Sequence, residues 1–346
     1  HHLYLIDGSG YIFRAYHALP PLTRASDGLP VGAVQGFCAM LHRLITNFGS
    51  EGPTHLAVVF DHSSKSFRNE IYDQYKAQRP DPPEDLARQF PLIRDATRAF
   101  SLPCIEMEGF EADDLIATYA TRAADGGPGI DMLDPIKNTR LGPEDVEKKF
   151  GVGPDKVIDV QALAGDSVDN IPGAPGIGVK TAAQLIEEWG DVETLLRHAE
   201  EIKQPKRRQT LIDKADQIRL SRELVTLKRD VPVEEEAGAF EVPEPNPDKL
   251  LAFLAEMEFR TLSRRVAEAM GTEAPVIGER TEGETGGGSD GEHPGAVAEM
   301  PEIDREAYEI VRDLDTLRAW AEEARAEGRL CIDLETTSLD EMTAEI

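Results

Sequence analysis

Two short apolar runs near the start of the chain each end on an aspartate. Residues 3–7 read LYLID and residues 56–61 read LAVVFD, so the runs end at Asp7 and Asp61. Short, continuous apolar runs are typical of strands buried on both faces, as in parallel sheets. Between them, apolar residues recur at helical spacing over 34–45, and a turn is expected at GSG, directly after Asp7. The alternation of strand and helix predicts an α/β fold with a parallel sheet.

A third run, at 102–107, is expected to be another strand, and an amphipathic helix follows it. Residues Ala112, Leu115, Ile116, Tyr119, Ala120 and Ala123 are spaced to form one buried face. Three acids, Glu111, Asp113 and Asp114, occupy the first turn. One interpretation is that they complement the positive end of the helix dipole. The other is that they bind a hard divalent cation, which would offset their mutual repulsion.

The two strand-terminal aspartates favour the metal interpretation. The carboxyl ends of parallel strands meet at one edge of a sheet, where ligands bind. Asp7 and Asp61 are therefore expected at the same edge as the acidic helix start. A single strand-terminal aspartate is more often a turn former. Two such residues beside a third acidic group indicate a shared metal site.

From residue 141 the pattern changes to short helices. Asp166 and Asp169 are three apart and are expected on one side of a turn, as a further carboxylate pair. PGIGVKTA, residues 175–182, predicts a glycine-rich hairpin that runs into a helix. Its backbone N–H groups and Lys180 could hold a phosphate without reading a base. The basic stretch 203–214 could extend that contact.

Basic and aromatic residues are interleaved over 65–79, before a proline-rich loop. One interpretation is a helix face that is simply exposed to solvent. The alternative is a surface that binds phosphates and unstacked bases. The residues concerned are Lys65, Phe67, Arg68, Tyr72, Tyr75, Lys76 and Arg79.

The net charge of −28 does not exclude nucleic acid, because the charge is unevenly distributed. Residues 272–346 hold 6 basic and 21 acidic residues, which is more than half of the acidic excess. Residues 272–302 predict a flexible acidic linker, and 303–346 a new α/β unit in which Asp333 and Glu335 share one face of a strand. The three dispersed cysteines and the lack of a long apolar run predict a cytoplasmic protein. Because the first residue is not Met and the last lies in a strand-like region, we expect a fragment of a longer chain.

These motifs, taken in order, resemble the bacterial DNA polymerase I family. LIDGSGYIFRAYHALPPL, VVFD, SFR, YKAQRP, EGFEADDLIA, GDSVDNIPGAPGIGVKTA and IDLETTSLD carry the resemblance over residues 2–346. It implies an α/β fold: a parallel-sheet, PIN-like 5′ nuclease domain at 1–135 and a helical helix-hairpin-helix subdomain at 136–271. After the linker at 272–302, residues 303–346 would be an α/β stub of a ribonuclease H-like 3′–5′ exonuclease domain.

The resemblance also implies a two-metal nuclease that uses Mg²⁺ or Mn²⁺. A first ion would be held by Asp7, Asp61, Glu111 and Asp113. Asp114, Asp166 and Asp169 would serve a second ion, directly or through water. Lys76 would be an electrostatic stabiliser, with Arg79, Arg68 and Arg14 steering the 5′ strand. The hairpin, with Gly176, Gly178, Lys180 and Thr181, would grip duplex phosphates and hold K⁺. The expected partner is DNA with a 5′ end or flap, bound without sequence specificity by a monomer.

One segment of the family pattern is absent. Between EADD and GDSVDN the family has a buried strand that ends in a DKD-type pair, whereas AADGG here passes straight to PGIDMLDP. Two second-ion carboxylates would therefore be missing, while Asp131 and Asp134 match non-ligand positions. Three hypotheses stay open: a 5′ nuclease, impaired or not; a DNA-binding fragment with little or no activity; and an RNA-cutting relative.

Overall fold

The computed structural model describes residues 2–47, 53–124, 132–134, 139–242, 245–277, 318–320, 322 and 325. The chain divides into two compact units, His1–Gly288 and Ser289–Ile346. In the second unit, the described residues are helical. Asp333, Glu335 and residues 278–302 of the expected linker lie outside the described residues. The elements described below all belong to the first unit. None of the described helices is both long enough and apolar enough to cross a membrane.

A three-stranded parallel sheet forms the centre of the first half of this unit. Its strands are β1 (Leu3–Asp7), β2 (His55–Val59) and β3 (Cys104–Ile105), in the order β1-β2-β3. Leu5 pairs with Ala57, so both long strands end at the same edge. The predicted parallel sheet is therefore confirmed for the described residues. The gap in the family pattern was expected between EADD and GDSVDN, and residues 125–131 there lie outside the described part of the chain.

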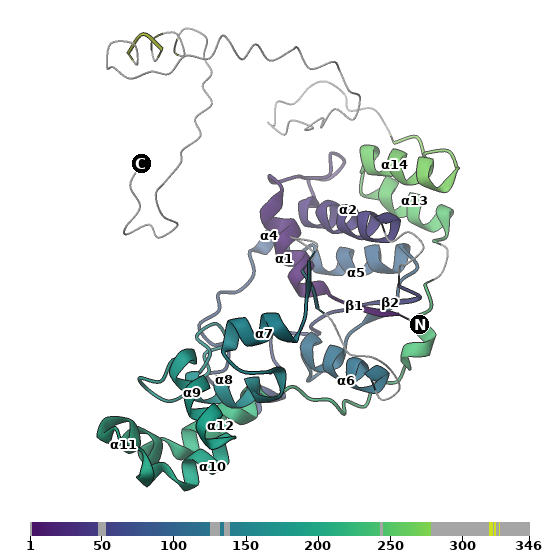
Figure 1. The fold of residues 1–346 in the computed structure, drawn as a ribbon. Coiled ribbons are helices and arrows are strands. Elements are labelled where there is room, and N and C mark those ends of the chain that lie inside the picture. Colours follow the sequence, from purple (N-terminus) through teal and green to yellow (C-terminus); the bar gives the residue numbers. More distant parts are fainter. Residues whose placement is uncertain are drawn as a thin grey trace, which may run out of the picture. The chain divides into compact units, whose positions relative to one another are not determined.

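Helices cover both faces of this sheet, as Figure 1 shows. Along β2, Leu56 and Val58 pack against α1 (Gly8–Ala18), α2 (Gly32–Asn47) and α5 (Phe90–Ala99). The alternate residues Ala57 and Val59 pack on the side of α6 (Ala112–Ala124). Burial on both faces explains why this strand reads as a continuous apolar run.

The helix α1 begins directly at Gly8, so the turn expected at GSG is instead the first turn of a helix. Asp7 is its N-cap. A Cβ atom at Gly8 would lie 2.4 Å from the ring of Phe60, which follows β2. Glycine therefore lets the start of α1 lie directly over the end of the neighbouring strand.

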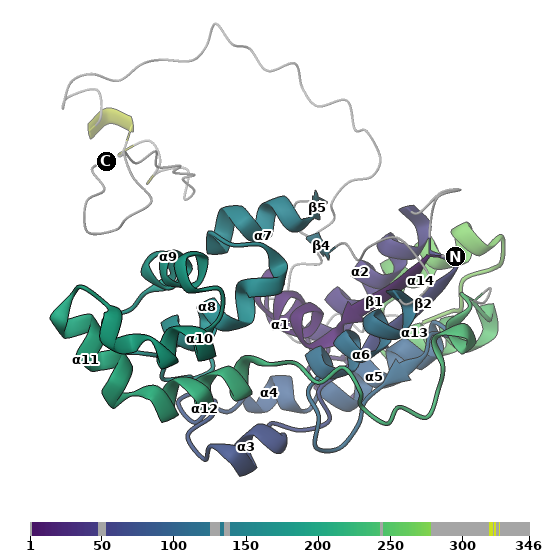
Figure 2. The ribbon, with the colours of Figure 1, turned by 60° about the horizontal axis from the view of Figure 1, so that its bottom comes forward.

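The second half of the unit is helical and has its own core. An antiparallel pair, β4 (Met132–Asp134) and β5 (Thr139–Leu141), leads into it. The buried residues of this core lie between Val152 and Ile218. Figures 1 and 2 show the helices together. They are α7 (Pro143–Phe150), α8 (Val157–Ala164), α9 (Val179–Trp189), α10 (Val192–Arg197), α11 (Pro205–Asp213) and α12 (Ala215–Val225), with the 3-10 helices η2 (Pro154–Lys156) and η3 (Ala199–Glu201).

After α12 the chain returns to the sheet. Phe240, in the 3-10 helix η4 (Ala237–Phe240), packs edge-on against Tyr119 with ring centroids 5.0 Å apart. The helices α13 (Pro247–Glu256) and α14 (Arg260–Met270) belong to the same core as α1, α2 and α5. The expected helical subdomain at 136–271 is therefore too long, because its last two helices bury their apolar faces against the first half.

Candidate metal centre and nucleic-acid interface

The predicted acids of the sheet edge meet where β1, β2 and α6 come together. Asp7 caps α1, and its Oδ1 accepts the N–H groups of Ser9 at 3.0 Å and Gly10 at 3.2 Å. Asp61 lies two residues beyond β2 and accepts the Ser9 hydroxyl at 2.6 Å through Oδ2. Its Oδ1 accepts the N–H of Ala112 at 2.8 Å. Asp61 therefore links the start of α1 to the start of α6.

Glu111 is held from the opposite side by the segment after β2. Its carboxylate accepts the hydroxyls of Ser66 and Tyr75, each at 3.1 Å. The Nζ atom of Lys76 lies 2.9 Å from Glu111 Oε2. The Arg68 guanidinium is a second, more distant cation, with Nη1 3.7 Å from the same oxygen. Two hydroxyl and two cationic partners thus orient Glu111 beside the sheet edge.

Negative charge accumulates at Asp113. Its side chain reaches solvent, yet protein atoms crowd it, and this loss of hydration, together with the charges of Asp7, Asp61 and Glu111, raises its pKa to about 6. Lys76 opposes the shift. The pKa of Asp7 is also raised, chiefly by burial and secondarily by Asp61. We call Asp7, Asp61, Glu111 and Asp113 the acidic cluster. Each member is electrostatically coupled to at least one other.

The donor chemistry of the acidic cluster fits one hard divalent cation. Its side chains are all carboxylates, the ligands that Mg²⁺ and Mn²⁺ accept. Within the described residues, however, no three His, Cys, Asp or Glu side chains are spaced to hold a metal ion. The four carboxylates therefore lie at one edge of the sheet, but they are farther apart than the ligands of a bound metal ion.

Asp114, expected at the second ion, has a different environment. It is fully buried, and its two oxygens accept bonds from Arg68 at 2.7 and 2.8 Å. Arg68, expected to steer the 5′ strand, is itself 1% exposed. Both expectations are corrected, because a buried ion pair presents neither charge to a ligand on the surface.

Asp166 and Asp169 occupy a tight loop between α8 and α9. Asp166 accepts the N–H of Val168 at 2.7 Å and so forms a local turn. Asp169 points toward the sheet half, where it pairs with Arg79 and accepts the Tyr75 hydroxyl at 3.2 Å. Through Tyr75, the loop is connected to Glu111.

Of the predicted basic residues, Lys76 and Arg79 form ion pairs with acids, whereas Arg14 forms none within the described residues. Lys76 has a left-handed backbone (φ 55°), and its N–H donates to the carbonyl of Asp169 at 3.0 Å. Arg79 is half exposed and bonded to Asp169, so it lies at the rim of the acids. Arg14 lies on α1, two turns after Asp7, and forms no ion pair within the described residues.

The glycine-rich hairpin presents backbone groups to solvent. Ile177 is buried, whereas the flanking Gly176 (φ 78°) and Gly178 are exposed. Gly178 is the N-cap of α9 and offers no side-chain cap, which leaves the first N–H groups of that helix, at Val179, Lys180 and Thr181, without one. An open groove of about 430 Å³ lies beside the hairpin. It is lined by Pro175, Pro205, Lys206, Gln209, Thr210, Asp213 and Lys214.

Several residues that hold the acids were not assigned from the sequence. Ser9 and Ser66 each donate a hydroxyl to a cluster acid, and Tyr75 bridges two acids that are 58 positions apart, Glu111 and Asp169. For Tyr75, one hint of a place in the site was present in the sequence: it directly precedes Lys76 in an aromatic and basic stretch. A hydroxyl and the carboxylate it bonds can lie at any separation along a chain, so no sequence pattern predicts such pairs.

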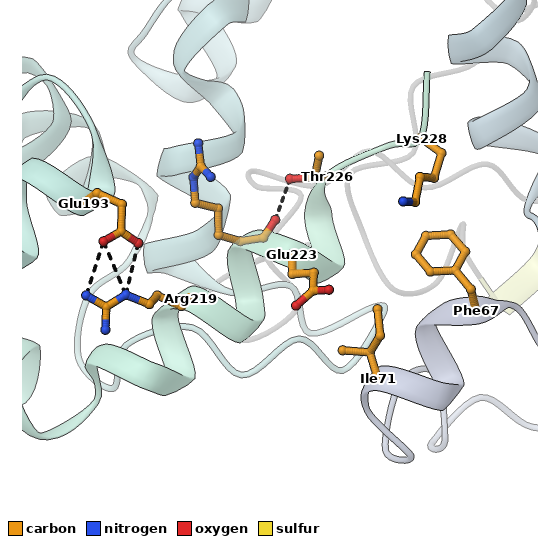
Figure 3. Close-up of a pocket in the computed structure, with 8 residues that line it drawn as sticks. Phe67, Ile71, Glu193, Arg219, Glu223, Thr226 and Lys228 are labelled. Atoms are coloured by element: carbon orange, nitrogen blue, oxygen red, sulfur yellow. Dashed lines mark hydrogen bonds and ion pairs between the residues drawn. The ribbon is translucent and has the colours of Figure 1, made fainter. Parts of the chain in front are cut away.

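A second groove, of about 390 Å³, lies away from the acidic cluster, between α3 (Phe67–Ile71) and the end of α12 (Figure 3). Glu193 and Arg219 form an ion pair at one end, 3.0 Å apart. At the other end Lys228 lies over the ring of Phe67, with Nζ 5.5 Å from its centroid. Its walls contain no member of the acidic cluster.

Family models match both halves of the first unit. Residues 2–134 match the 5′–3′ exonuclease N-terminal resolvase-like domain, and residues 152–248 match the 5′–3′ exonuclease C-terminal SAM fold. The two matches agree with the sheet half and the helical half of the structure.

Two relatives are similar along much of the chain. A 5′–3′ exonuclease of Aquifex aeolicus is 37% identical over 281 positions, which cover 76% of this chain and 94% of the relative. A DNA polymerase I of Rhizobium leguminosarum is 48% identical over 413 positions, which cover all of this chain and 41% of the relative. This chain therefore spans about two fifths of that relative. The 413 positions exceed the 346 residues here by 67, so at least 67 residues of the relative have no counterpart.

Among solved structures, the flap endonuclease of bacteriophage T5, in a complex with DNA and metal ions, is similar in fold. The TM-score is 0.51 with 19% sequence identity, over 78% of this chain and 98% of the phage protein. The similarity supports a PIN-like 5′ nuclease fold with a helical, SAM-like half.

Proposed function

Because this chain belongs to the 5′–3′ exonuclease family, we propose that it is a structure-specific nuclease that hydrolyses DNA phosphodiesters near a 5′ end or flap. The observation that carries the proposal is the acidic cluster at the carboxyl edge of the sheet. Four carboxylates from three separate elements meet there, and burial, followed by their mutual charge, raises the pKa of Asp113 and Asp7. Such an accumulation of acids is typical of a site that binds cations.

In this proposal Asp7, Asp61, Glu111 and Asp113 would hold Mg²⁺ or Mn²⁺. When bound, the ion would supply an activated water and stabilise charge on the phosphate. Ser9, Ser66 and Tyr75 orient the carboxylates through their hydroxyl groups. Lys76, with Nζ 2.9 Å from Glu111, places a positive charge where the phosphate would approach.

The helical half would hold the duplex. The exposed N–H groups of the hairpin, together with Lys180 and Thr181, suit a phosphate, and a K⁺ ion could share this site. Two further exposed lysines without an ion pair in the described part of the chain, Lys206 and Lys214, line the groove beside the hairpin. Lys203, also exposed, lies just before α11 in the chain. These contacts read no base, so binding would be independent of sequence and weakened by salt.

We extend the proposal to the rest of the chain. The match to a DNA polymerase I over the whole chain supports a linker at 272–302 and the start of a ribonuclease H-like domain at 303–346, with Asp333 and Glu335 in its first strand. We also propose that some of the unmatched residues of that relative correspond to a segment missing here between EADD and GDSVDN. We propose a monomer that acts in the cytoplasm on DNA from replication or repair.

Cleavage of a labelled 5′-flapped duplex tests the activity. With Mg²⁺ or Mn²⁺, short products are expected from the flap, and none with EDTA. Asp113→Asn should abolish the products while retaining flap binding, because the hairpin is unchanged. If the flap is bound but neither metal supports cleavage, the enzymatic proposal is wrong.

That outcome would favour a second candidate, a DNA-binding module without turnover. A specific observation supports it: the acids expected at a second ion are engaged elsewhere, Asp114 by Arg68 and Asp169 by Arg79. The module predicts flap binding that weakens with salt and survives Asp113→Asn. Comparing DNA and RNA flaps in the same assay tests the RNA-cutting alternative.

A further inference from the structure

Arg68 is the largest fully buried side chain among the described residues. It forms two parallel bonds to Asp114, at 2.7 and 2.8 Å, and Asp114 is also fully buried. The desolvation cost of a buried ion pair can equal or exceed the attraction between its charges, so stability alone is a poor explanation of the pair. Its remaining hydrogen bonds indicate another role.

On one side, the pair is bonded to the segment that leaves α12. Arg68 donates to the carbonyls of Leu224 at 2.8 Å and Thr226 at 3.1 Å. Asp114 accepts the N–H of Lys228 at 2.8 Å. The pair therefore ties α3 and α6 to the end of the helical half, and Figure 2 shows α3 beside α12.

On the other side, the pair is bonded to the acidic cluster. Asp114 accepts the N–H of Glu111 at 3.2 Å and donates its own N–H to the carbonyl of Glu111 at 3.0 Å. This reciprocal arrangement resembles a capping box and fixes the backbone of Glu111 at the start of α6. Arg68 Nη1 also lies 3.7 Å from Glu111 Oε2.

We propose that Arg68 and Asp114 are positioning residues for the acidic cluster. They set the placement of Glu111, and so the affinity for the divalent ion, and they fix the cluster relative to the helical half that would hold the duplex. This inference rests on the proposed function. It assigns neither residue to contact with DNA or metal, since Phe67 covers the guanidinium at 4.6 Å and leaves 1% of Arg68 exposed. In Figure 3, Phe67 and Lys228 lie together at this end of the groove.

Mn²⁺ binding to the whole chain, followed by electron paramagnetic resonance, tests the proposal. The double variant Arg68→Met with Asp114→Leu removes both charges, and such apolar replacement of a buried pair commonly retains the fold. Outer partners of metal ligands typically contribute 10- to 100-fold in metal affinity, so Mn²⁺ should bind about 10- to 100-fold more weakly. The flap products should also spread over more positions, because the helical half is less firmly fixed.

A control replaces an ion pair that, within the described residues, has no bond to the acidic cluster. Arg222→Met with Asp159→Leu removes an ion pair within the helical half, 2.9 Å long, and should leave Mn²⁺ affinity unchanged. Thermal unfolding establishes that each variant is folded. If Arg68→Met with Asp114→Leu does not fold, Arg68→Lys supplies the test, because it keeps the charge but loses the paired geometry. It should weaken Mn²⁺ binding several-fold.

Two results are distinguishable. A folded variant at Arg68 that binds Mn²⁺ as tightly as the unchanged chain would overturn the positioning role. If the unchanged chain shows no Mn²⁺ site that Asp113→Asn removes, the proposed function fails first, and the positioning role with it.

Discussion

At the scale of single residues, the acids at the sheet edge are held by partners that do not neutralise them fully. Asp61 is fixed by a hydroxyl and a backbone N–H, whereas Lys76 is the one cation within 3 Å of Glu111 among the described residues. Burial, followed by the charges of the neighbouring acids, raises the pKa of Asp113 to about 6 from its ordinary value of 3.8. Repulsion among these carboxylates lowers the stability of the metal-free fold, and a bound cation would offset that repulsion.

The raised pKa of Asp113 predicts the direction of a pH effect. The folded chain binds this proton more tightly than the unfolded chain, so the metal-free protein should gain stability as the pH falls from about 7 toward 4. Asp113→Asn should raise the melting temperature in EDTA at pH 7.5 by about 1–3 °C, a modest figure because the side chain reaches solvent. It should have little effect at pH 4.5.

Calorimetry in EDTA at both pH values measures this difference. Asp248→Asn, at an exposed position on α13, is the control and should change neither value. An equal or lower melting temperature for Asp113→Asn at pH 7.5 would contradict the expected repulsion.

Tyr75→Phe tests how much the hydroxyl that joins Glu111 and Asp169 contributes to stability. The change removes a buried hydroxyl that donates to Glu111 and Asp169, and burial, followed by these two charges, raises the pKa of this phenol, so it stays a donor. Bonds to charged groups contribute about 1.5–3 kcal/mol, so the free energy of unfolding should fall by roughly this amount. Urea denaturation measures it. Tyr72→Phe is the control, and equal losses for both would exclude a special role for Tyr75.

The sequence predicted the position of a residue where that position follows from the order of strands and helices. Asp7 and Asp61 could be placed at one edge because both follow parallel strands. The partnership of Arg68 with Asp114 could not, because a charged side chain gives the same sequence signal whether it is buried or exposed. Only the fold shows that α3 and the end of α12 enclose it.

At the scale of elements, tight loops position the two halves of the site. The loop that carries Asp166 and Asp169 is closed by Gly165 and Gly173. Gly173 has a φ of 57°, and a Cβ there would lie 2.4 Å from the nitrogen of Gly165. The sequence predicted the helix after this loop, which is α9, but neither α8 before it nor the close approach of the loop's ends.

Gly173→Ala should therefore lower the free energy of unfolding by about 2–4 kcal/mol, from backbone strain and overpacking together. Gly238→Ala is the matched control, because nothing lies within 4 Å of its added Cβ. It should change stability by less than about 0.5 kcal/mol. Chemical denaturation of both variants gives the comparison, and similar values would mean that the loop tolerates a side chain.

Lys180→Ala tests the hairpin as a phosphate-binding element. Duplex affinity should fall similarly for unrelated sequences, and the slope of log affinity against log salt should decrease in magnitude by about one. Lys249→Ala, an exposed lysine on α13, controls for net charge. Fluorescence anisotropy at several salt concentrations measures both. An unchanged slope for Lys180→Ala would remove this lysine from the interface.

At the scale of the whole molecule, two cores divide the chain unequally. One comprises residues from Val152 to Ile218, whereas the other joins Ile6 to Ala267. The resemblance placed all of 136–271, and with it α13 and α14, in the helical subdomain. An amphipathic pattern reports that a helix buries one face and carries no information on its partner.

Leu254→Ala tests this division. Leu254 is fully buried with the sheet half, so its truncation should lower the free energy of unfolding by about 2–5 kcal/mol. Hydrogen exchange should show lost protection in β1 and β2, with α8 and α9 less affected. Leu211→Ala, in the helical core, should give the reverse pattern. Loss of protection in α8 and α9 alone for Leu254→Ala would contradict the assignment.

The late position of α13 and α14 has a consequence during synthesis. As the chain leaves the ribosome, the segment from Val152 to Ile218, which shares one core, emerges complete before α13 and α14. The sheet half, although its strands are made first, lacks Leu254 and Val266 until the end of α14 has emerged. The second half in sequence is thus expected to fold first, and the acids of the first half meet only when the ribosome has passed them by more than 150 residues.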